Sequence, residues 1–309
     1  MKRRPSPRAK KLCVKSVNWH IWPFCNYRCQ FCFAPFRALR KKSGFLNLDD
    51  GTKLIDALVG EGMRKLTFAG GEPMLCPWLG DYLEYAKDRT MMTMIVTNGS
   101  RLTKDFLQKR AWAIDWVALS IDSAREDVER NLGRGTGDHV SNVLKLRSLL
   151  RDFNIKVKVN VTVTRWAIQE DLHSILSKLE PDRIKFLQVL PIRGENDQHV
   201  DRLLISRAEF YRFVERHRDL GVVAEDNDSM RGSYVMIDPV GRFFQNTTGA
   251  LKFSDPILEV GVQNALNQVG FDWDRLVTRG GDYYFTDSYL ESTNHSLQGI
   301  ADTDSASGR

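Results

Sequence analysis

The chain has 309 residues, of which 42% are hydrophobic and 27% are charged. This composition excludes an intrinsically disordered protein, and no window approaches the ~20 consecutive apolar residues that a transmembrane helix requires. The formal net charge of +6 favours anionic partners only slightly. We therefore expect a soluble, cytoplasmic protein with enough residues for one large domain or two smaller ones.

The first two thirds of the chain alternate between short apolar runs and longer segments of helical period. In one such segment Leu54 and Leu58 lie four residues apart, as do Ile55 and Val59, which places them on one face of a helix. Strand–helix alternation repeated six times predicts an α/β fold, with a parallel sheet in a partial (βα)6 barrel and chemistry at the carboxyl ends of the strands. The predicted strands are residues 14–22, 65–68, 92–97, 116–121, 155–164 and 183–190, and the predicted helices are 49–61, 77–88, 104–111, 139–151 and 168–179.

After Pro191 this alternation ends. We expect the barrel at residues 15–190 and a C-terminal α+β extension at residues 191–290 that covers the active site. A basic, flexible N-terminus (1–14) and a polar, disordered tail (291–309) are predicted to flank them. Within the extension the sequence predicts a loop at 194–202, a helix at 207–218, short strands near 234–237 and 242–244, and a helix at 260–269.

Three of the five cysteines, Cys25, Cys29 and Cys32, crowd into a Cys-x3-Cys-x2-Cys motif directly after the first predicted strand. An odd cysteine count with this clustering favours a reduced compartment and a metal site over a disulfide framework. Three thiolates on one loop can hold three irons of a [4Fe–4S] cluster and leave the fourth iron open. The alternative is a zinc site completed by His20, although zinc motifs usually have a second cysteine pair, which this sequence lacks.

This motif, followed by Gly-Gly-Glu-Pro at residues 70–73 after the second strand, resembles the radical S-adenosylmethionine (SAM) superfamily. The resemblance implies a [4Fe–4S] cluster whose open iron chelates SAM, and one-electron cleavage of SAM to a 5′-deoxyadenosyl radical. Glycines there allow close backbone approach to a ligand. The cofactor-binding residues implied by the resemblance are Phe31, Gly70, Gly71, Glu72, Asn98, Ser120 and Arg134.

Further stretches resemble the viperin family within that superfamily, and the similarity spans about residues 15–284. It implies dehydration of a nucleoside triphosphate, typically CTP, to the 3′-deoxy-3′,4′-didehydro form, an antiviral chain terminator. The radical would remove the C4′ hydrogen, the 3′-hydroxyl would leave as water, and a donor such as flavodoxin or ferredoxin would supply electrons. The similar stretches are residues 17–20, 97–100, 119–123, 133–135, 192–196, 204–206 and 257–261.

The fifth predicted strand alternates valine with polar residues, so Lys158, Asn160 and Thr162 share one face. On the next strand Arg183 and Lys185 share a face in the same way. Buried cations without partners are too costly to be tolerated, so cations facing the barrel interior predict a polyanionic ligand such as a triphosphate. The alternative is that both strands lie at a sheet edge with a solvated face.

The viperin resemblance also implies a set of substrate contacts. CTP is the favoured substrate, with UTP or GTP as alternatives, and Lys158 and Tyr234 are the candidates for the proton steps. The substrate-binding residues implied are Asn18, Lys65, Lys158, Asn160, Arg183, Lys185, Tyr234 and Lys252.

Two other functions remain open from the sequence. A radical SAM enzyme that modifies a peptide is disfavoured because such enzymes commonly carry further cysteines near the C-terminus, and no cysteine follows Cys76. RNA modification would use the basic N-terminus, although we expect no stable nucleic-acid partner. A zinc-stabilised interaction protein is the non-enzymatic alternative. The amphipathic membrane helix of vertebrate viperins has no counterpart at the N-terminus, so no membrane association is expected.

Overall fold

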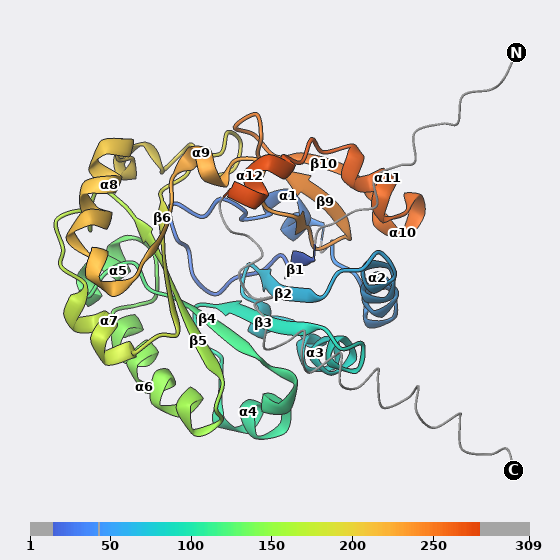
Figure 1. Cartoon of the computed structure of the whole chain (residues 1–309), viewed down its shortest axis with the longest axis horizontal. Helices are drawn as coiled ribbons and strands as arrows, with labels where there is room; N and C mark the ends of the chain where they lie inside the picture. The colour runs from blue at the N-terminus through green and yellow to red at the C-terminus, as the bar shows by residue number, and fades with distance from the viewer. Residues whose placement is uncertain (1–14, 43, 279–309) are drawn as a thin grey trace, which may run out of the picture.

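The computed structural model describes residues 15–42 and 44–278. Six parallel strands form the partial barrel that the sequence predicts, and each pairs with the next in chain order (Figure 1). Parallel strands place all their carboxyl ends on one rim, and this rim holds the site described below. The strands are β1 (Ser16–Trp22), β2 (Lys65–Gly70), β3 (Met92–Thr97), β4 (Trp116–Ser120), β5 (Lys156–Val163) and β6 (Arg183–Gln188).

Helices cover the outside of this sheet because each presents one apolar face. In α2, Leu54, Ile55 and Leu58 are fully buried, and Asn47 begins the helix by accepting a hydrogen bond from the backbone N–H of Asp50. The outer helices of the barrel are α2 (Leu48–Gly60), α3 (Leu79–Asp88), α4 (Lys104–Arg110), α5 (Glu126–Asn131), α6 (His139–Asp152) and α7 (His173–Leu179).

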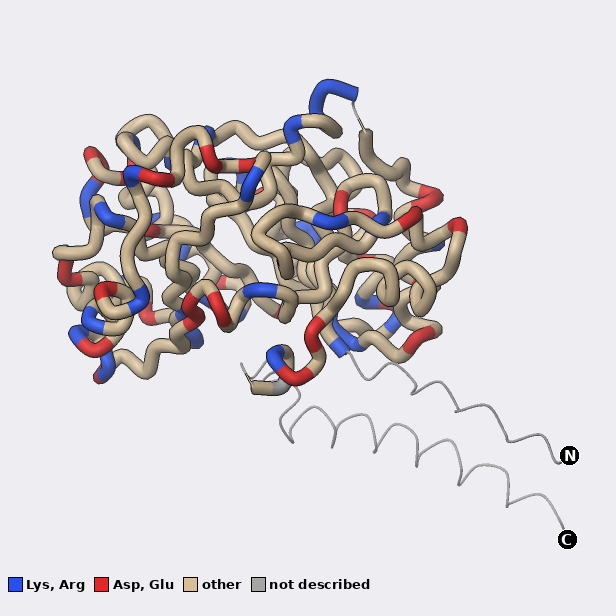
Figure 2. The backbone as a smooth tube through the Cα atoms, turned by 90° about the horizontal axis from the view of Figure 1, so that it is seen from above, with Lys and Arg blue, Asp and Glu red and all other residues tan. Residues whose placement is uncertain are grey.

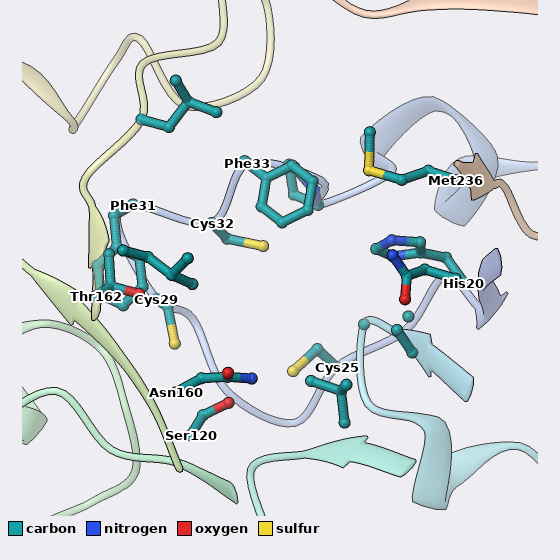
Figure 3. Close-up of a pocket in the computed structure, with 18 of the residues that line it drawn as sticks. His20, Cys25, Cys29, Phe31, Cys32, Phe33, Ser120, Asn160, Thr162 and Met236 are labelled. Carbon is teal, nitrogen blue, oxygen red and sulfur yellow. The ribbon is translucent and has the colours of Figure 1, made fainter. Parts of the chain in front are cut away.

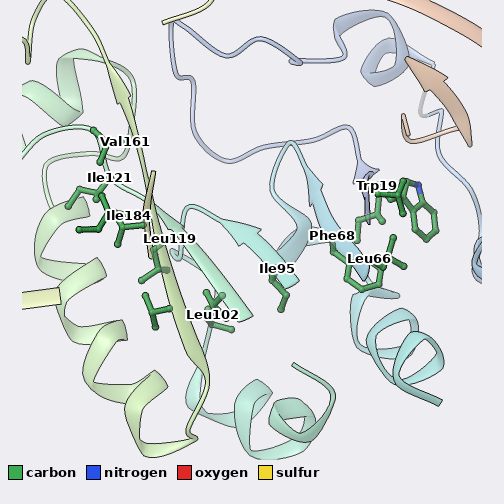
Figure 4. Close-up of a cluster of buried hydrophobic side chains, with 14 of the residues drawn as sticks. Trp19, Leu66, Phe68, Ile95, Leu102, Leu119, Ile121, Val161 and Ile184 are labelled. Carbon is green, nitrogen blue, oxygen red and sulfur yellow. The ribbon is translucent and has the colours of Figure 1, made fainter. Parts of the chain in front are cut away.

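The main core lies between the sheet and these helices. Leu66, Ile95, Leu119 and Val161 come from four different strands and are fully buried in one cluster (Figure 4). The odd-numbered valines of β5 belong to this cluster, as the alternation predicts. The even-numbered residues of β5 therefore face the barrel interior.

The C-terminal extension adds strands to both edges of the barrel sheet. β7 (Val223–Glu225) pairs with β6, whereas β8 (Met236–Ile237) pairs in parallel with β1 at the opposite edge. β9 (Arg242–Gln245) and β10 (Lys252–Pro256) continue from β8 in antiparallel fashion. The chain between β7 and β8 therefore passes from one edge of the sheet to the other, across the open side of the barrel.

Two predicted helices differ most from those in the structure. The helix expected at 168–179 begins only at His173, where the Asp171 side chain accepts a hydrogen bond from the His173 backbone N–H. The helix expected at 260–269 is interrupted at Gly261, whose φ of +83° is not helical. The remaining helices are α1 (Arg37–Lys41), α8 (Arg207–Arg216), α9 (Asn227–Met230), α10 (Ile257–Val260), α11 (Val262–Asn267) and α12 (Trp273–Thr278), with 3-10 turns at Pro73–Leu75, Ala111–Ala113, Asp201–Leu203 and Arg218–Leu220.

The predicted N-terminal segment and the predicted tail lie outside the described residues, as does the end of the predicted extension. No helix of the described chain is both long enough and apolar enough to cross a bilayer. Basic and acidic positions are interspersed along the described trace, and the basic excess is not gathered on one side of it (Figure 2).

Candidate active site

A cavity of about 520 Å³ lies in the barrel interior, and its wall extends from Ser16 and Lys65, which begin β1 and β2, to the carboxyl ends of the strands. Its wall includes residues from β1 to β6, the loop after β1 and the segment before β8. This volume is typical of sites for small ligands and cofactors. Of the residues predicted from the sequence, those that line it are Asn18, Cys25, Cys29, Phe31, Cys32, Lys65, Gly70, Gly71, Glu72, Asn98, Ser120, Arg134, Lys158, Asn160, Lys185 and Tyr234.

The three cysteines lie on the loop between β1 and α1 and have free thiols. Figure 3 shows their sulfur atoms directed into the space beside Ser120 and Asn160. Burial raises the pKa of all three thiols, that of Cys29 to about 12, so a bound cation is needed to stabilise the thiolates.

Three cysteine thiols line the cavity, and cysteine thiolates are the normal ligands of an iron–sulfur cluster, in which each binds a different iron. In the alternative zinc site His20 would be the fourth ligand. His20 instead lies among the rings of Phe33, Phe36 and Phe244, and burial lowers its pKa to about 4.

Backbone contacts on two sides hold the cysteine loop. The backbone N–H of Gly71 donates to the Trp22 carbonyl over 2.7 Å, and that of Arg28 donates to the Gly133 carbonyl over 3.0 Å. A Cβ atom on Gly71 would lie 2.2 Å from the Phe24 carbonyl oxygen, which real structures do not tolerate. The close approach that Gly71 permits is therefore to the protein's own loop.

Glu72 ties the Gly-Gly-Glu-Pro turn to the end of β3. Its side chain is 1% exposed, and its carboxylate accepts hydrogen bonds from the Thr97 hydroxyl (2.6 Å) and the Asn98 backbone N–H (2.8 Å). Burial raises the pKa of Glu72, and these hydrogen bonds oppose the rise. The Asn98 side chain in turn donates to the Asn26 side chain of the cysteine loop over 3.0 Å. Glu72 thus holds this rim of the cavity together.

Arg134 places a cation beside the cysteine loop. Its Nε donates to the Asp122 carboxylate over 2.6 Å, and Glu129 lies 3.7 Å away. The other Asp122 oxygen accepts from the Thr162 backbone N–H, and Glu129 accepts from the backbone N–H of Asp122. Sequence reasoning missed both carboxylates because isolated acidic residues give no periodic signal. They fix the direction of the Arg134 guanidinium, which lies 5.5 Å from the Phe31 ring.

Three lysines from three strands converge in the cavity. Lys65, Lys158 and Lys185 are 4%, 8% and 3% exposed, and β5 is an interior strand, so these cations do not lie on a solvated sheet edge. Burial, together with Lys185, Lys65 and Arg183, lowers the pKa of Lys158 well below its usual value. Such a concentration of buried positive charge fits a polyanionic ligand.

Glu225 is a carboxylate in this cationic region that sequence reasoning did not find. It lies at the end of β7 and accepts hydrogen bonds from Lys185 Nζ (2.5 Å) and from the Tyr234 phenol. Lys185 Nζ also donates to the Tyr234 oxygen over 3.1 Å. The alternation in β5 and β6 predicted the lysines, but β7 has three residues and carries no readable period.

Two predicted substrate residues do not line the cavity. Arg183 pairs with Lys158 in the β5–β6 register and influences its pKa, but it lies outside the cavity wall. Lys252 begins β10 opposite Gln245 and is exposed. By contrast, the buried Asn160 Oδ1 and His20 Nδ1 line the cavity and have no hydrogen-bond partner among the described residues.

Comparisons with known proteins agree with this geometry. The model of the radical SAM superfamily matches residues 19–179. The chain is 41% identical to the S-adenosylmethionine-dependent nucleotide dehydratase of Flammeovirga pacifica over 277 residues, which cover 87% of this chain and 96% of that protein. It is 34% identical to the S-adenosylmethionine-dependent nucleotide dehydratase RSAD2 of Oncorhynchus mykiss over 284 residues, which cover 88% of this chain and 80% of that protein.

Among solved structures, Streptococcus suis SuiB bound to its precursor peptide SuiA shares the fold. The TM-score is 0.63 at 16% sequence identity, over 86% of this chain and 67% of that chain. The sequence similarity to the dehydratases, the superfamily match and the three-cysteine loop agree. The chain therefore belongs to the radical SAM superfamily and, within it, to the viperin family of S-adenosylmethionine-dependent nucleotide dehydratases.

Proposed function

We propose that the protein converts a ribonucleoside triphosphate, preferably CTP, to its 3′-deoxy-3′,4′-didehydro form. The observation that carries this proposal is one cavity lined by both the three loop cysteines and three buried lysines. A cofactor beside the cysteines and a triphosphate beside the lysines would leave the sugar of the nucleotide between them. The names of the relatives from Flammeovirga pacifica and Oncorhynchus mykiss support the same reaction class.

The cysteine side of the cavity would hold the cofactors of the superfamily, a [4Fe–4S] cluster and SAM. Cys25, Cys29 and Cys32 would bind the cluster, since thiolates are its normal ligands. When bound, the cluster and SAM supply the 5′-deoxyadenosyl radical that removes the C4′ hydrogen atom of the nucleotide. Arg134, oriented by Asp122, would bind the carboxylate of SAM through its guanidinium.

The lysine side would bind the triphosphate. Lys65, Lys158 and Lys185 supply charge-assisted hydrogen bonds from three different strands, which fixes both the position and the direction of a phosphate chain. Tyr234 lines the same cavity and would contact the sugar. Lys158 and Tyr234 are the candidates that would move a proton when the 3′-hydroxyl leaves as water. The protein's own contribution is thus positioning and charge stabilisation in a water-poor cavity.

We further propose that a low-potential donor such as flavodoxin or ferredoxin supplies the electrons, and that the protein acts in the cytoplasm. The support for the compartment is that cysteines required as cluster ligands need to stay reduced.

The test is an anaerobic assay of the reconstituted, reduced protein with SAM and each of the four ribonucleoside triphosphates. We expect a nucleotide product lighter by one water molecule, with 5′-deoxyadenosine in a similar amount, and CTP as the best substrate. Formation of 5′-deoxyadenosine without any dehydrated nucleotide would contradict the proposal. Turnover of RNA in a parallel reaction would favour the alternative enzyme class.

Matched cysteine variants make this assay specific. Cys32→Ala removes a predicted cluster ligand and should abolish both products. Cys76→Ala removes a buried thiol that does not line the cavity, and both products should persist.

A further inference from the structure

Glu225 places a buried negative charge directly behind the lysines of the cavity, although it does not line the cavity itself. Its side chain is 1% exposed, and each carboxylate oxygen has a partner: Lys185 Nζ at 2.5 Å on one, and the Tyr234 hydroxyl on the other. Its charge also counteracts the effect of the surrounding cations on the pKa of Lys158. A carboxylate here weakens the attraction of the cavity for phosphate, so affinity for the substrate does not explain it.

The two partners of Glu225 come from opposite edges of the barrel. Lys185 lies on β6, whereas Tyr234 lies two residues before β8, which pairs with β1. Glu225 itself ends β7, and in Figure 1 helix α9 follows it across the gap between these edges. The Glu225 carboxylate therefore fixes the distance between a side chain at one edge and a side chain at the other.

The hydrogen bonds also set the direction of the Tyr234 phenol. Its O–H donates to Glu225, and its oxygen accepts from Lys185 Nζ over 3.1 Å. While Glu225 is ionised, these two hydrogen bonds hold the phenol in place at the wall of the cavity that Tyr234 lines. The proposed contact of Tyr234 with the sugar would be made from this position.

We propose that Glu225 is a positioning residue that sets the sugar contact of Tyr234 in register with the phosphate contact of Lys185. This inference rests on the proposed function. Glu225 does not touch the substrate; it acts through its two partners. Glu225 would increase turnover, because a misplacement of the reacting sugar by about 1 Å can reduce the rate about 100-fold. It would decrease affinity, because its negative charge repels the triphosphate.

The variant Glu225→Gln separates these two effects. Glutamine keeps the volume but has one acceptor oxygen and an NH2 group that can only donate, so it cannot accept from both Lys185 and the Tyr234 hydroxyl as the carboxylate does. We expect CTP to bind about threefold to tenfold more tightly, because the cavity gains one net positive charge. Formation of dehydrated nucleotide should fall by about 10-fold to 100-fold. The amount of 5′-deoxyadenosine formed per dehydrated nucleotide should rise.

These opposite changes distinguish positioning from a merely structural role. A variant that only loosens the fold would lose affinity and turnover together, and its product ratio would stay unchanged. The matched control is Asp228→Asn, which removes the same charge from an exposed side chain three residues away and should leave all three quantities unchanged. CTP affinity is measured by calorimetry, and the two products by chromatography.

Glu225→Asp provides a second test should the glutamine variant fail to fold. It keeps the charge but shortens the reach by one methylene, so CTP affinity should stay within about twofold while turnover falls at least fivefold. Wild-type turnover in either variant, or weaker CTP binding in Glu225→Gln, would overturn the inference. If the wild-type protein dehydrates no nucleotide, the proposed function fails instead.

Discussion

Lys158 illustrates how a binding residue costs stability when no ligand is present. The residue is 8% exposed, and burial, together with the like charges of Lys185, Lys65 and Arg183, lowers its pKa. Lys158→Met keeps most of the side-chain volume and removes the charge. We expect the free energy of unfolding of the ligand-free protein to rise by about 1–3 kcal/mol. CTP affinity should fall by about 100-fold.

Urea denaturation and calorimetry measure the two quantities. Lys156→Met is the matched control on the same strand, because Lys156 is exposed and its ammonium group lies over the face of Trp116. It should change the free energy of unfolding by no more than about 0.5 kcal/mol and leave CTP affinity unchanged. A less stable Lys158→Met protein would show that the lysine is already satisfied within the folded chain.

The same lysine predicts a pH dependence of nucleotide binding. In the free protein burial, together with Lys185, Lys65 and Arg183, lowers the pKa of Lys158, and Glu225 opposes this shift only in part. Phosphate oxygens in contact with Lys158 would raise that pKa, so binding takes up a proton at pH values between the free-state pKa and the higher bound-state pKa. Affinity should therefore weaken as the pH rises through this window.

Calorimetry of CTP binding in buffers of different ionisation enthalpy measures this proton uptake directly. At pH 8 the phosphates themselves are fully ionised, so they contribute little. We expect uptake of up to about one proton in the wild type and none from this source in Lys158→Met. Equal uptake in both proteins would assign the proton to another group.

At the residue scale the sequence revealed cations better than carboxylates. Lys158 and Lys185 stand out because they interrupt buried strands with regular alternation. Asp122, Glu129 and Glu225 do not, because each looks like an ordinary surface acid until its partner is known. Lys185 lies 40 residues before Glu225 in the chain, a pairing that only the fold creates.

Among the structural elements, the cysteine loop depends on glycines from other segments that pack closely against its backbone. Gly133 has a φ of +84°, and a Cβ atom there would lie 2.1 Å from the Arg28 carbonyl oxygen. Gly133→Ala therefore pushes apart the backbone hydrogen bonds by which Arg28 and Gln30 of the cysteine loop donate to the carbonyls of residues 133 and 132. We expect the variant to lose at least half of the iron that the wild-type protein binds on reconstitution, measured as iron per protein chain.

Gly137→Ala is the control for backbone strain alone. Gly137 also has a positive φ, +113°, but the nearest atom to an added Cβ is the end of the flexible Arg130 side chain at 3.6 Å. The variant should lose roughly 1 kcal/mol of stability and keep its iron. If both variants bind iron like the wild type, the contact at Gly133 does not position the cysteines.

The elements that the sequence predicted are those with a clear period. The six barrel strands and most of their helices follow from alternating apolar segments, and the structure confirms them. The short strands expected near 234–237 and 242–244 are present as β8 and β9, whereas β7, with three residues, is too short for any pattern and was not predicted. The places of β7 and β8 depend on backbone pairing with β6 and β1, which no local signal encodes.

In the whole molecule, the segment from Val223 to Ile237 joins both edges of the sheet. The Asn18 backbone N–H on β1 donates to the Val235 carbonyl over 2.9 Å, and Lys185 on β6 contacts Glu225 and Tyr234. A partial barrel lacks the closing strand pairs of a full barrel. Contacts from residues 223–237, and from a bound nucleotide, would therefore stabilise the two edges against separation.

Nucleotide binding should therefore protect this segment from amide hydrogen exchange. A triphosphate held by Lys158 and Lys185, with its sugar at Tyr234, adds contacts between the edges and makes local opening less favourable. We expect saturating CTP to slow exchange at residues 223–237 by about tenfold or more, measured by mass spectrometry, while α4 on the outer face stays unchanged. Cytidine, which lacks the phosphates, should give no protection at the same concentration. Protection restricted to β5 and β6, with none between Tyr234 and Ile237, would show that the nucleotide occupies one side of the cavity and does not connect the edges.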